Sequence, residues 1–126
     1  MRLLVVEDSP LLRKMFGLAF PHQTNDLKPA ESGRAAMALL EASSEPFDAV
    51  LLDLRMPDMD GVEFLRALRR QPVHGRTPVI VTTAESDESE LIEQARAIGV
   101  AAVVKKPWAP QALRTIVQHV IDPPPG

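Results

Sequence analysis

Three carboxylates directly follow apolar runs of the kind that form buried strands. Glu7 and Asp8 come after the run Leu3 to Val6, and Asp53 comes after Ala49 to Leu52. If the two runs are neighbouring strands, the three carboxylates lie together and repel one another unless a cation joins them. The ligands on offer are carboxylate, backbone carbonyl and water, so the cation would be a hard one. Mg²⁺ fits best, because it keeps several waters that a phosphate can replace.

A hydroxyl and an ammonium can complete such a site from the opposite side. Thr82 and Thr83 end a fourth apolar run, and Lys105 and Lys106 follow a fifth. An anionic group held between a cation and a lysine is typical of a phosphoryl site. Taken alone, each residue is most often a solvated strand end, and an acid pair commonly just favours the start of a helix. Their joint placement favours the phosphoryl site but leaves open which threonine and which lysine take part.

The strands and helices that must position these residues can be predicted from two kinds of segment that alternate along the chain. Short apolar runs alternate with segments of helical period, which indicates strands separated by helices. That pattern predicts a parallel sheet with helices on both faces, in which ligands bind beyond the carboxyl ends of the strands. The five expected strands are Leu3 to Val6, Asn25 to Lys28, Ala49 to Leu52, Val79 to Thr82 and Val100 to Val104.

Helix ends carry their own signals. Ser9 is a good N-cap placed before Pro10, and Pro110 can begin the last helix in the same way. Gly99 suits a helix C-terminus. We therefore predict one doubly wound, three-layer α/β domain of five strands and five helices over residues 1–121. Residues 122–126 are rich in proline and are expected to form an extended tail or the start of a linker.

The length and composition of the chain argue against several classes of protein. A chain of 126 residues is about one domain, which argues against a two-domain enzyme. The longest apolar stretches, Ala35 to Leu40 and Val100 to Val104, are far shorter than the roughly 18 residues that cross a bilayer, and the N-terminal run is too short for a secretory signal. We therefore expect a cytoplasmic protein without membrane contact. The chain has no cysteine, which excludes thiolate chemistry.

The charge pattern and the positions of the histidines argue against a nucleic-acid-binding protein and against a histidine-based metal site. The formal net charge is −3, and lysine and arginine are scattered, which argues against a nucleic-acid surface. His22, His74 and His119 lie far apart without ligand spacing, so we interpret them as surface residues rather than metal ligands.

Four motifs in order resemble a known family. The most specific is the loop from Asp53 to Gly61, which reads Asp-Leu-Arg-Met-Pro-Asp-Met-Asp-Gly. The acid pair after the first strand, the segment Pro78 to Ala84, and Lys106-Pro107 complete the pattern. From Leu3 to about Ile121 the chain resembles the receiver domain of bacterial two-component response regulators, in particular the CheY-like single-domain kind. The resemblance implies a flavodoxin-like sheet with strand order 2-1-3-4-5.

The resemblance also implies a role for each motif residue. Asp53 would accept a phosphoryl group from a sensor histidine kinase or a phosphotransfer protein, with Lys106 and Thr83 taking part in catalysis. Such a domain catalyses only its own phosphorylation and dephosphorylation and is not otherwise an enzyme. Lys106 is matched rather than Lys105 because it precedes a proline, and the Lys106–Pro107 peptide bond is expected to be cis. The implied Mg²⁺ ligands are Glu7, Asp8, Asp53 and the backbone carbonyl of Arg55, and the implied phosphate-binding residues are Thr83, Ala84, Lys106 and Met56.

Signalling would follow from an inward turn of Thr83 toward the phosphoryl group, altering affinity for a downstream protein target at the face of the fourth helix, fifth strand and fifth helix. Val103 stands where many relatives have a rotating aromatic, so the switch should rely on backbone movement. Val100 and Ala101 replace an acidic pair of relatives that dimerise on DNA, which favours a monomer or weak dimer that docks a protein. We also hypothesise that an Arg55–Glu85 pair partly covers the phosphoryl group and slows its hydrolysis.

Three alternatives remain open. The chain can be the N-terminal receiver of a longer regulator with an output domain beyond residue 126. A phosphatase with Asp53 as nucleophile is disfavoured, because such enzymes usually have a second acid two residues later, where this chain has Arg55. A flavodoxin-like FMN carrier is disfavoured as well, since the cluster of three carboxylates repels the FMN phosphate when no metal is present.

Overall fold

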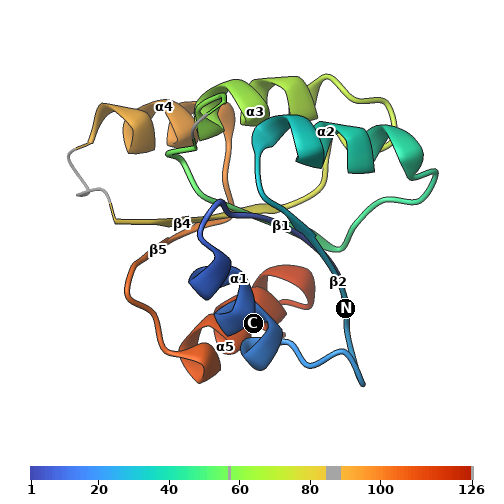
Figure 1. The fold of residues 1–126 in the computed structure, drawn as a ribbon, viewed down its shortest axis with the longest axis vertical. Coiled ribbons are helices and arrows are strands. Elements are labelled where there is room, and N and C mark those ends of the chain that lie inside the picture. Colours follow the sequence, from blue (N-terminus) through green and yellow to red (C-terminus); the bar gives the residue numbers. More distant parts are fainter. Residues whose placement is uncertain (57, 85–88, 126) are drawn as a thin grey trace.

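A computed structural model describes residues 1–56, 58–84 and 89–125. Within these residues, five strands alternate with five helices along the chain (Figure 1). The strands are β1 (Arg2–Val6), β2 (Asp26–Ala30), β3 (Ala49–Leu52), β4 (Val79–Thr83) and β5 (Ala102–Lys105). The helices are α1 (Pro10–Ala19), α2 (Gly33–Ala42), α3 (Gly61–Arg69), α4 (Glu90–Ile98) and α5 (Pro110–Ile121).

The strands form one parallel sheet in the order β2-β1-β3-β4-β5. Helices α2, α3 and α4 cover one face of the sheet, and α1 and α5 cover the other (Figure 1). The chain winds outward from β1 to β2 and then returns to β3, so the strand order reverses between β1 and β3. The predicted doubly wound fold is therefore confirmed, and its switch point lies where a ligand site is expected.

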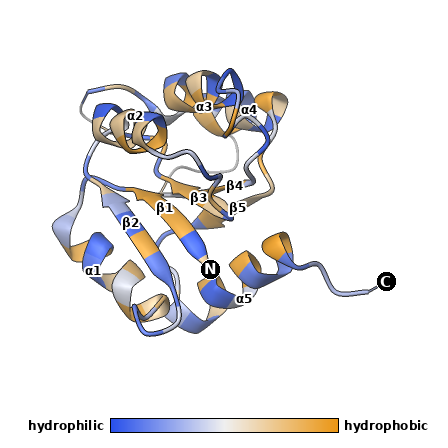
Figure 2. Cartoon of the chain, turned by 90° about the vertical axis from the view of Figure 1, so that its right-hand side faces the viewer, coloured by the Kyte–Doolittle hydropathy of each residue, from blue (hydrophilic) through white to orange (hydrophobic). Residues whose placement is uncertain are grey.

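Alternate residues of each strand supply two separate core layers. On β1, Leu4 and Val6 pack toward α2–α4, whereas Leu3 and Val5 pack toward α1 and α5. All four side chains are at most 1% exposed, as a central strand covered on both faces requires. The continuous apolar colour of the central strands is visible in Figure 2. Each such side chain contributes about 1.5–3 kcal/mol by leaving water.

The predicted helix ends are confirmed where the structure describes them. The Ser9 hydroxyl accepts the Leu12 N–H at 3.3 Å, and Pro10 is the first residue of α1. Pro110 begins α5 in the same way. Gly99 ends α4 with a φ of 117°, a conformation that residues with a side chain rarely adopt. The Lys106–Pro107 peptide bond is cis, as the resemblance implied.

Four strands differ from their predicted bounds: β1 begins one residue earlier, at Arg2, β4 ends one residue later, at Thr83, and β2 and β5 differ more. Strand β2 continues to Ala30, past Pro29, because β2 lies at the edge of the sheet and a proline there need not donate to a second neighbour. Strand β5 begins at Ala102 rather than Val100, because the chain is still turning after Gly99 and pairing starts with Ala102 opposite Ile80.

The interpretation of His74 as a surface residue was wrong. Its side chain is buried, and its Nε2 lies 3.0 Å from the Leu40 carbonyl oxygen and 3.2 Å from that of Ser43. Both carbonyls lie at the C-terminal end of α2; the Leu40 carbonyl also accepts the Ser43 N–H at 3.2 Å, and the His74 ring nitrogen adds a second donor there. His74 therefore fastens the loop between α3 and β4 to α2. His22 and His119 are exposed, as predicted.

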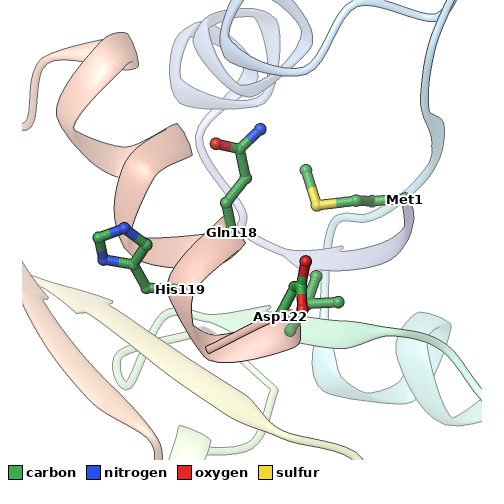
Figure 3. A pocket seen from close by; sticks show the side chains of 5 residues that line it. Met1, Gln118, His119 and Asp122 are labelled. Carbon is green, nitrogen blue, oxygen red and sulfur yellow. The ribbon is translucent and has the colours of Figure 1, made fainter. Parts of the chain in front are cut away.

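The end of the sheet where the strands begin holds a cavity of about 390 Å³. Met1, Gln118, His119, Ile121 and Asp122 line it, between the N-terminus and the last turn of α5 (Figure 3). The tail after α5 points away from the domain (Figure 2). Within the described residues, no helix has the length and apolar character needed to cross a membrane.

Candidate functional site

The three predicted carboxylates meet at the carboxyl ends of β1 and β3. These strands are neighbours, with Val6 opposite Leu52, so the residues that follow them emerge side by side. One oxygen from each of Glu7, Asp8 and Asp53 lies within 4.8 Å of the others. The side chains of Glu7 and Asp53 are buried, whereas Asp8 is exposed and opens the cluster to solvent.

Backbone hydrogen bonds extend the sheet beyond the strand ends and hold this acidic cluster in place. The Glu7 N–H donates to the Ala30 carbonyl at 3.0 Å, and the Asp53 N–H donates to the Val6 carbonyl at 3.0 Å. Because both bonds continue the parallel ladder, the directions of the Glu7 and Asp53 side chains follow from the sheet itself.

Lys106 faces the acidic cluster from the end of β5. Its Nζ lies 2.8 Å from Glu7 Oε1 and 3.2 Å from Asp53 Oδ2. The Lys106 N–H donates to the Thr83 carbonyl at 2.9 Å, which joins the ends of β4 and β5. Burial opposes the charge of Lys106, but its contacts with Glu7 and Asp53 outweigh burial and raise the pKa of its ammonium. The neighbouring Lys105 is exposed.

The pKa of Glu7 indicates that the Lys106 ammonium alone does not balance the negative charge of the acidic cluster. Burial raises the pKa of Glu7 to about 7; the contact with Lys106 lowers it, and the charge of Asp53 raises it further. A buried carboxylate with such a pKa is poorly compensated by its surroundings. A divalent cation at the acidic cluster would supply the missing charge, and an all-oxygen donor set suits Mg²⁺. The residues present therefore fit a Mg²⁺ ion.

The loop after β3 is anchored close to Asp53. The Arg55 N–H donates to Asp53 Oδ1 at 3.2 Å, and the Gly61 N–H donates to the Leu54 carbonyl at 2.8 Å. A Cβ at Gly61 would lie 2.6 Å from the Leu54 Cα, so only glycine lets α3 begin this close to the loop. Asp60 caps α3 by accepting the Glu63 N–H at 2.8 Å.

Sequence reasoning missed Arg13. Its Nη1 donates to the Glu7 carbonyl at 2.8 Å, which fixes the backbone between the two acids. The Ser9 N–H donates to Glu7 Oε2 at 3.2 Å. One signal could have indicated Arg13: it lies one turn after the N-cap Ser9, and helical side chains tilt back toward the N-terminus of their helix, here the end of β1.

The other predicted site residues lie around this centre. Thr83 is buried at the end of β4, and Ala84 is exposed just beyond it. Met56 is half-buried and packs on the core layer under α2–α4, whereas Arg55 is exposed. Glu85 lies outside the described residues, and so does the hypothesised Arg55–Glu85 pair.

Two further side chains at this end are packing residues. Trp108 is buried, and its ring centroid lies 4.7 Å from that of Phe16 on α1. Thr82 is also buried, and within the described part of the chain its Oγ1 has no hydrogen-bond partner.

A five-stranded sheet of this order, with an acidic cluster and a lysine at its switch point, defines the receiver class of signalling domains. The family model for the response regulator receiver domain matches residues 3–118. The chain belongs to this family.

Similar proteins include both single-domain and longer regulators. The chain is 30% identical to the chemotaxis protein CheY of Pseudomonas aeruginosa, over 97% of each chain. It is 38% identical to the regulatory protein AtoC of Escherichia coli over 96% of its own length, which is only 25% of AtoC. Its structure superposes on chemotaxis response regulator CheY4 of Vibrio cholerae with a TM-score of 0.84 and 31% identity, covering 94% of this chain and 97% of CheY4.

Proposed function

We propose that the chain is a phosphorylation-controlled receiver in which Asp53 accepts a phosphoryl group from a sensor histidine kinase or a phosphotransfer protein. The observation that carries this proposal is the acidic cluster of Glu7, Asp8 and Asp53 opposed by the Lys106 ammonium. Membership of the receiver family supports it. Apart from its own phosphorylation and dephosphorylation, the domain has no enzymatic role in this proposal.

The transfer chemistry is an in-line displacement at phosphorus. An Asp53 carboxylate oxygen attacks, a new O–P bond forms, and the P–N bond of the donor's phosphohistidine breaks with its electron pair going to the imidazole. Bound Mg²⁺ would neutralise negative charge on the transferred group, and Glu7, Asp8, Asp53 and the Arg55 backbone carbonyl are the residues proposed to hold it. Lys106 already contacts Asp53 and can move its ammonium onto a phosphoryl oxygen, so it would share that charge.

The remaining phosphate contacts are assigned to the end of β4 and to the loop after β3. Thr83 would donate its hydroxyl to a phosphoryl oxygen, and Ala84 and Met56 would line the same group. For hydrolysis of the acyl phosphate, we propose that Arg55 and Glu85 modulate the approach of water. Dephosphorylation rates of Arg55→Ala and Glu85→Ala test this role, and unchanged rates in both variants would remove it.

The output is proposed to be a changed affinity for a protein target at the face of α4, β5 and α5. Strand β5 is an edge strand, and Val103 is only half-buried, so this region can change its packing without opening the central sheet. Because Val103 offers no large ring to rotate, the change would come from backbone movement after Thr83. We expect a cytoplasmic monomer or weak dimer that binds neither nucleic acid nor membrane through this domain.

A second candidate is the receiver domain of a longer regulator. The chain spans 25% of AtoC and 32% of the cyclic di-GMP phosphodiesterase response regulator RpfG of Xanthomonas campestris, which favours this possibility. In that case residues 1–121 would be the receiver domain, and residues 122–126 would start a linker to an output domain.

Incubation with acetyl phosphate tests the proposed function. With Mg²⁺, intact-mass measurement should detect one added phosphoryl group on the wild type and none on Asp53→Asn. Chelation of the metal should suppress the gain. A wild type that stays unmodified under these conditions, while an established receiver is modified beside it, would contradict the proposal.

A further inference from the structure

Asp58 lies in the loop between β3 and α3, which follows Asp53 and is called the phosphoacceptor loop here. Its side chain hydrogen-bonds to a third element, helix α2. Its Oδ1 accepts the Gly33 N–H at 3.2 Å, and its Oδ2 accepts the Arg34 N–H at 3.0 Å. These are the first two N–H groups of α2, which the helix cannot satisfy by itself. Asp58 thus caps α2 from 25 positions further along the chain.

The rest of the α2 N-terminus is capped locally. The Ser32 hydroxyl accepts the Ala35 N–H at 3.1 Å, and the Ser32 carbonyl accepts the Ala36 N–H at 3.0 Å. The Ala36 bond is the first regular bond of the helix, so of the first three N–H groups of α2 the Ser32 side chain caps one and Asp58 caps two. This division offers a matched pair of caps on one helix end, of which only Asp58 belongs to the phosphoacceptor loop.

A close packing contact reinforces the link beside these hydrogen bonds. A Cβ added at Gly33 would overlap Met59 Cγ, so the Met59 side chain lies directly against the α2 backbone. Neighbouring residues 58 and 59 thus both hold α2, one by hydrogen bonds and the other by contact. Helices α2 and α3 lie next to each other on the same face of the sheet (Figure 1).

The charge of Asp58 suits this position. Hydrogen bonds from Arg34 N–H above all, and also from Gly33 N–H, lower the pKa of the Asp58 carboxyl. The carboxylate faces the positive end of the α2 dipole, which stabilises it further. The contact is therefore in its ionised form at neutral pH.

We propose that Asp58 is a positioning residue of the cation site, because it ties the phosphoacceptor loop to α2 and so holds Asp53 and the Arg55 backbone in place for a divalent ion. The inference rests on the proposed Mg²⁺ site. The far end of the loop is already fixed by Gly61 and Asp60 at α3, and Asp58 fixes its middle. Coupling of this kind is reciprocal, so an ion at the acidic cluster should in turn tighten the N-terminus of α2.

Titration with Mg²⁺, followed by isothermal titration calorimetry, tests the proposal on the wild type and three variants. Asp58→Ala should weaken Mg²⁺ binding by about tenfold, the lower end of the effect usual for residues that orient metal ligands. Asp58→Asn, which keeps one acceptor oxygen, should lie between. Ser32→Ala removes the other cap of the same helix and should leave the Mg²⁺ affinity unchanged. Urea unfolding of each variant separates a loss of stability from a loss of positioning.

Hydrogen exchange of the wild type and of Asp58→Ala provides a second, independent test. Addition of Mg²⁺ should slow exchange of the Gly33 and Arg34 amides, and Asp58→Ala should abolish that protection. Equal Mg²⁺ affinity of wild type and Asp58→Ala would overturn the inference, and so would an equal loss in Ser32→Ala. A wild type that binds no Mg²⁺ would overturn the proposed function together with the inference, so the two failures are distinguishable.

Discussion

Glu7 should make the stability of the metal-free protein depend on pH. Its pKa rises from 4.5 to about 7 on folding, chiefly because burial disfavours the charged form. The folded state therefore binds a proton that the unfolded state releases. Protonated Glu7 therefore stabilises the folded state relative to the ionised form; this contribution to the free energy of unfolding is fully present below pH 4.5 and is lost as the pH rises through about 7.

The expected size follows from the shift itself. Each pKa unit corresponds to about 1.4 kcal/mol, so between pH 5 and pH 8 the free energy of unfolding should fall by about 2–3 kcal/mol through this one group. Glu7→Gln keeps the size of the side chain and removes the titration. The difference between the two proteins isolates Glu7, since the other ionisable groups titrate in both.

Urea unfolding in the presence of a chelator measures this difference. The chain has one tryptophan and no tyrosine, so fluorescence reports on the buried Trp108 alone. Added Mg²⁺ should restore stability to the wild type at pH 8, because the ion binds the ionised form. Parallel stability curves for wild type and Glu7→Gln from pH 5 to pH 8 would refute this reading of the site.

Three substitutions test other contacts. Lys106→Met should lower the free energy of unfolding of the metal-free protein by about 1–3 kcal/mol, because it removes the ammonium that contacts Glu7 and Asp53, and added Mg²⁺ should recover most of the loss in urea titrations. Gly61→Ala should cost about 1–3 kcal/mol in the same assay and slow phosphorylation by acetyl phosphate, since its Cβ would press on the Leu54 backbone. His74→Ala should lower the thermal midpoint, at a cost of about 1–3 kcal/mol, but leave the rate of phosphorylation unchanged, because it removes the donor to two carbonyls far from the acidic cluster.

The parallel sheet and the position of the carboxylates at its edge were predictable, because both depend on the pattern of apolar residues along the chain. Apolar runs separated by helical periods define parallel strands, and parallel strands bring their carboxyl ends to one edge. Glu7, Asp8 and Asp53 gather because β1 and β3 are also neighbours, a strand order that only the family resemblance implied. The choice of Lys106 over Lys105 needed the family resemblance, and in the structure it is Lys106 that contacts the acids.

Apart from the Arg13 bond to Glu7, the contacts that sequence reasoning missed join elements distant in the chain. Asp58 reaches α2 across 25 positions, and His74 reaches Leu40 across 34. Neither has a periodic pattern around it, because each interaction depends on how two helices lie against each other rather than on one helix. The end of β2 was predicted too early, and only the sheet order shows that β2 is an edge strand, which accommodates Pro29.

The site of phosphorylation is the most direct test of the central claim. Reduction of the phosphorylated protein with borohydride converts a phosphoaspartate to homoserine, and peptide mass analysis then locates it. We expect the converted residue at position 53, formed only when Mg²⁺ is present. Conversion at Asp8 or at any other acid, with Asp53 intact, would contradict the account.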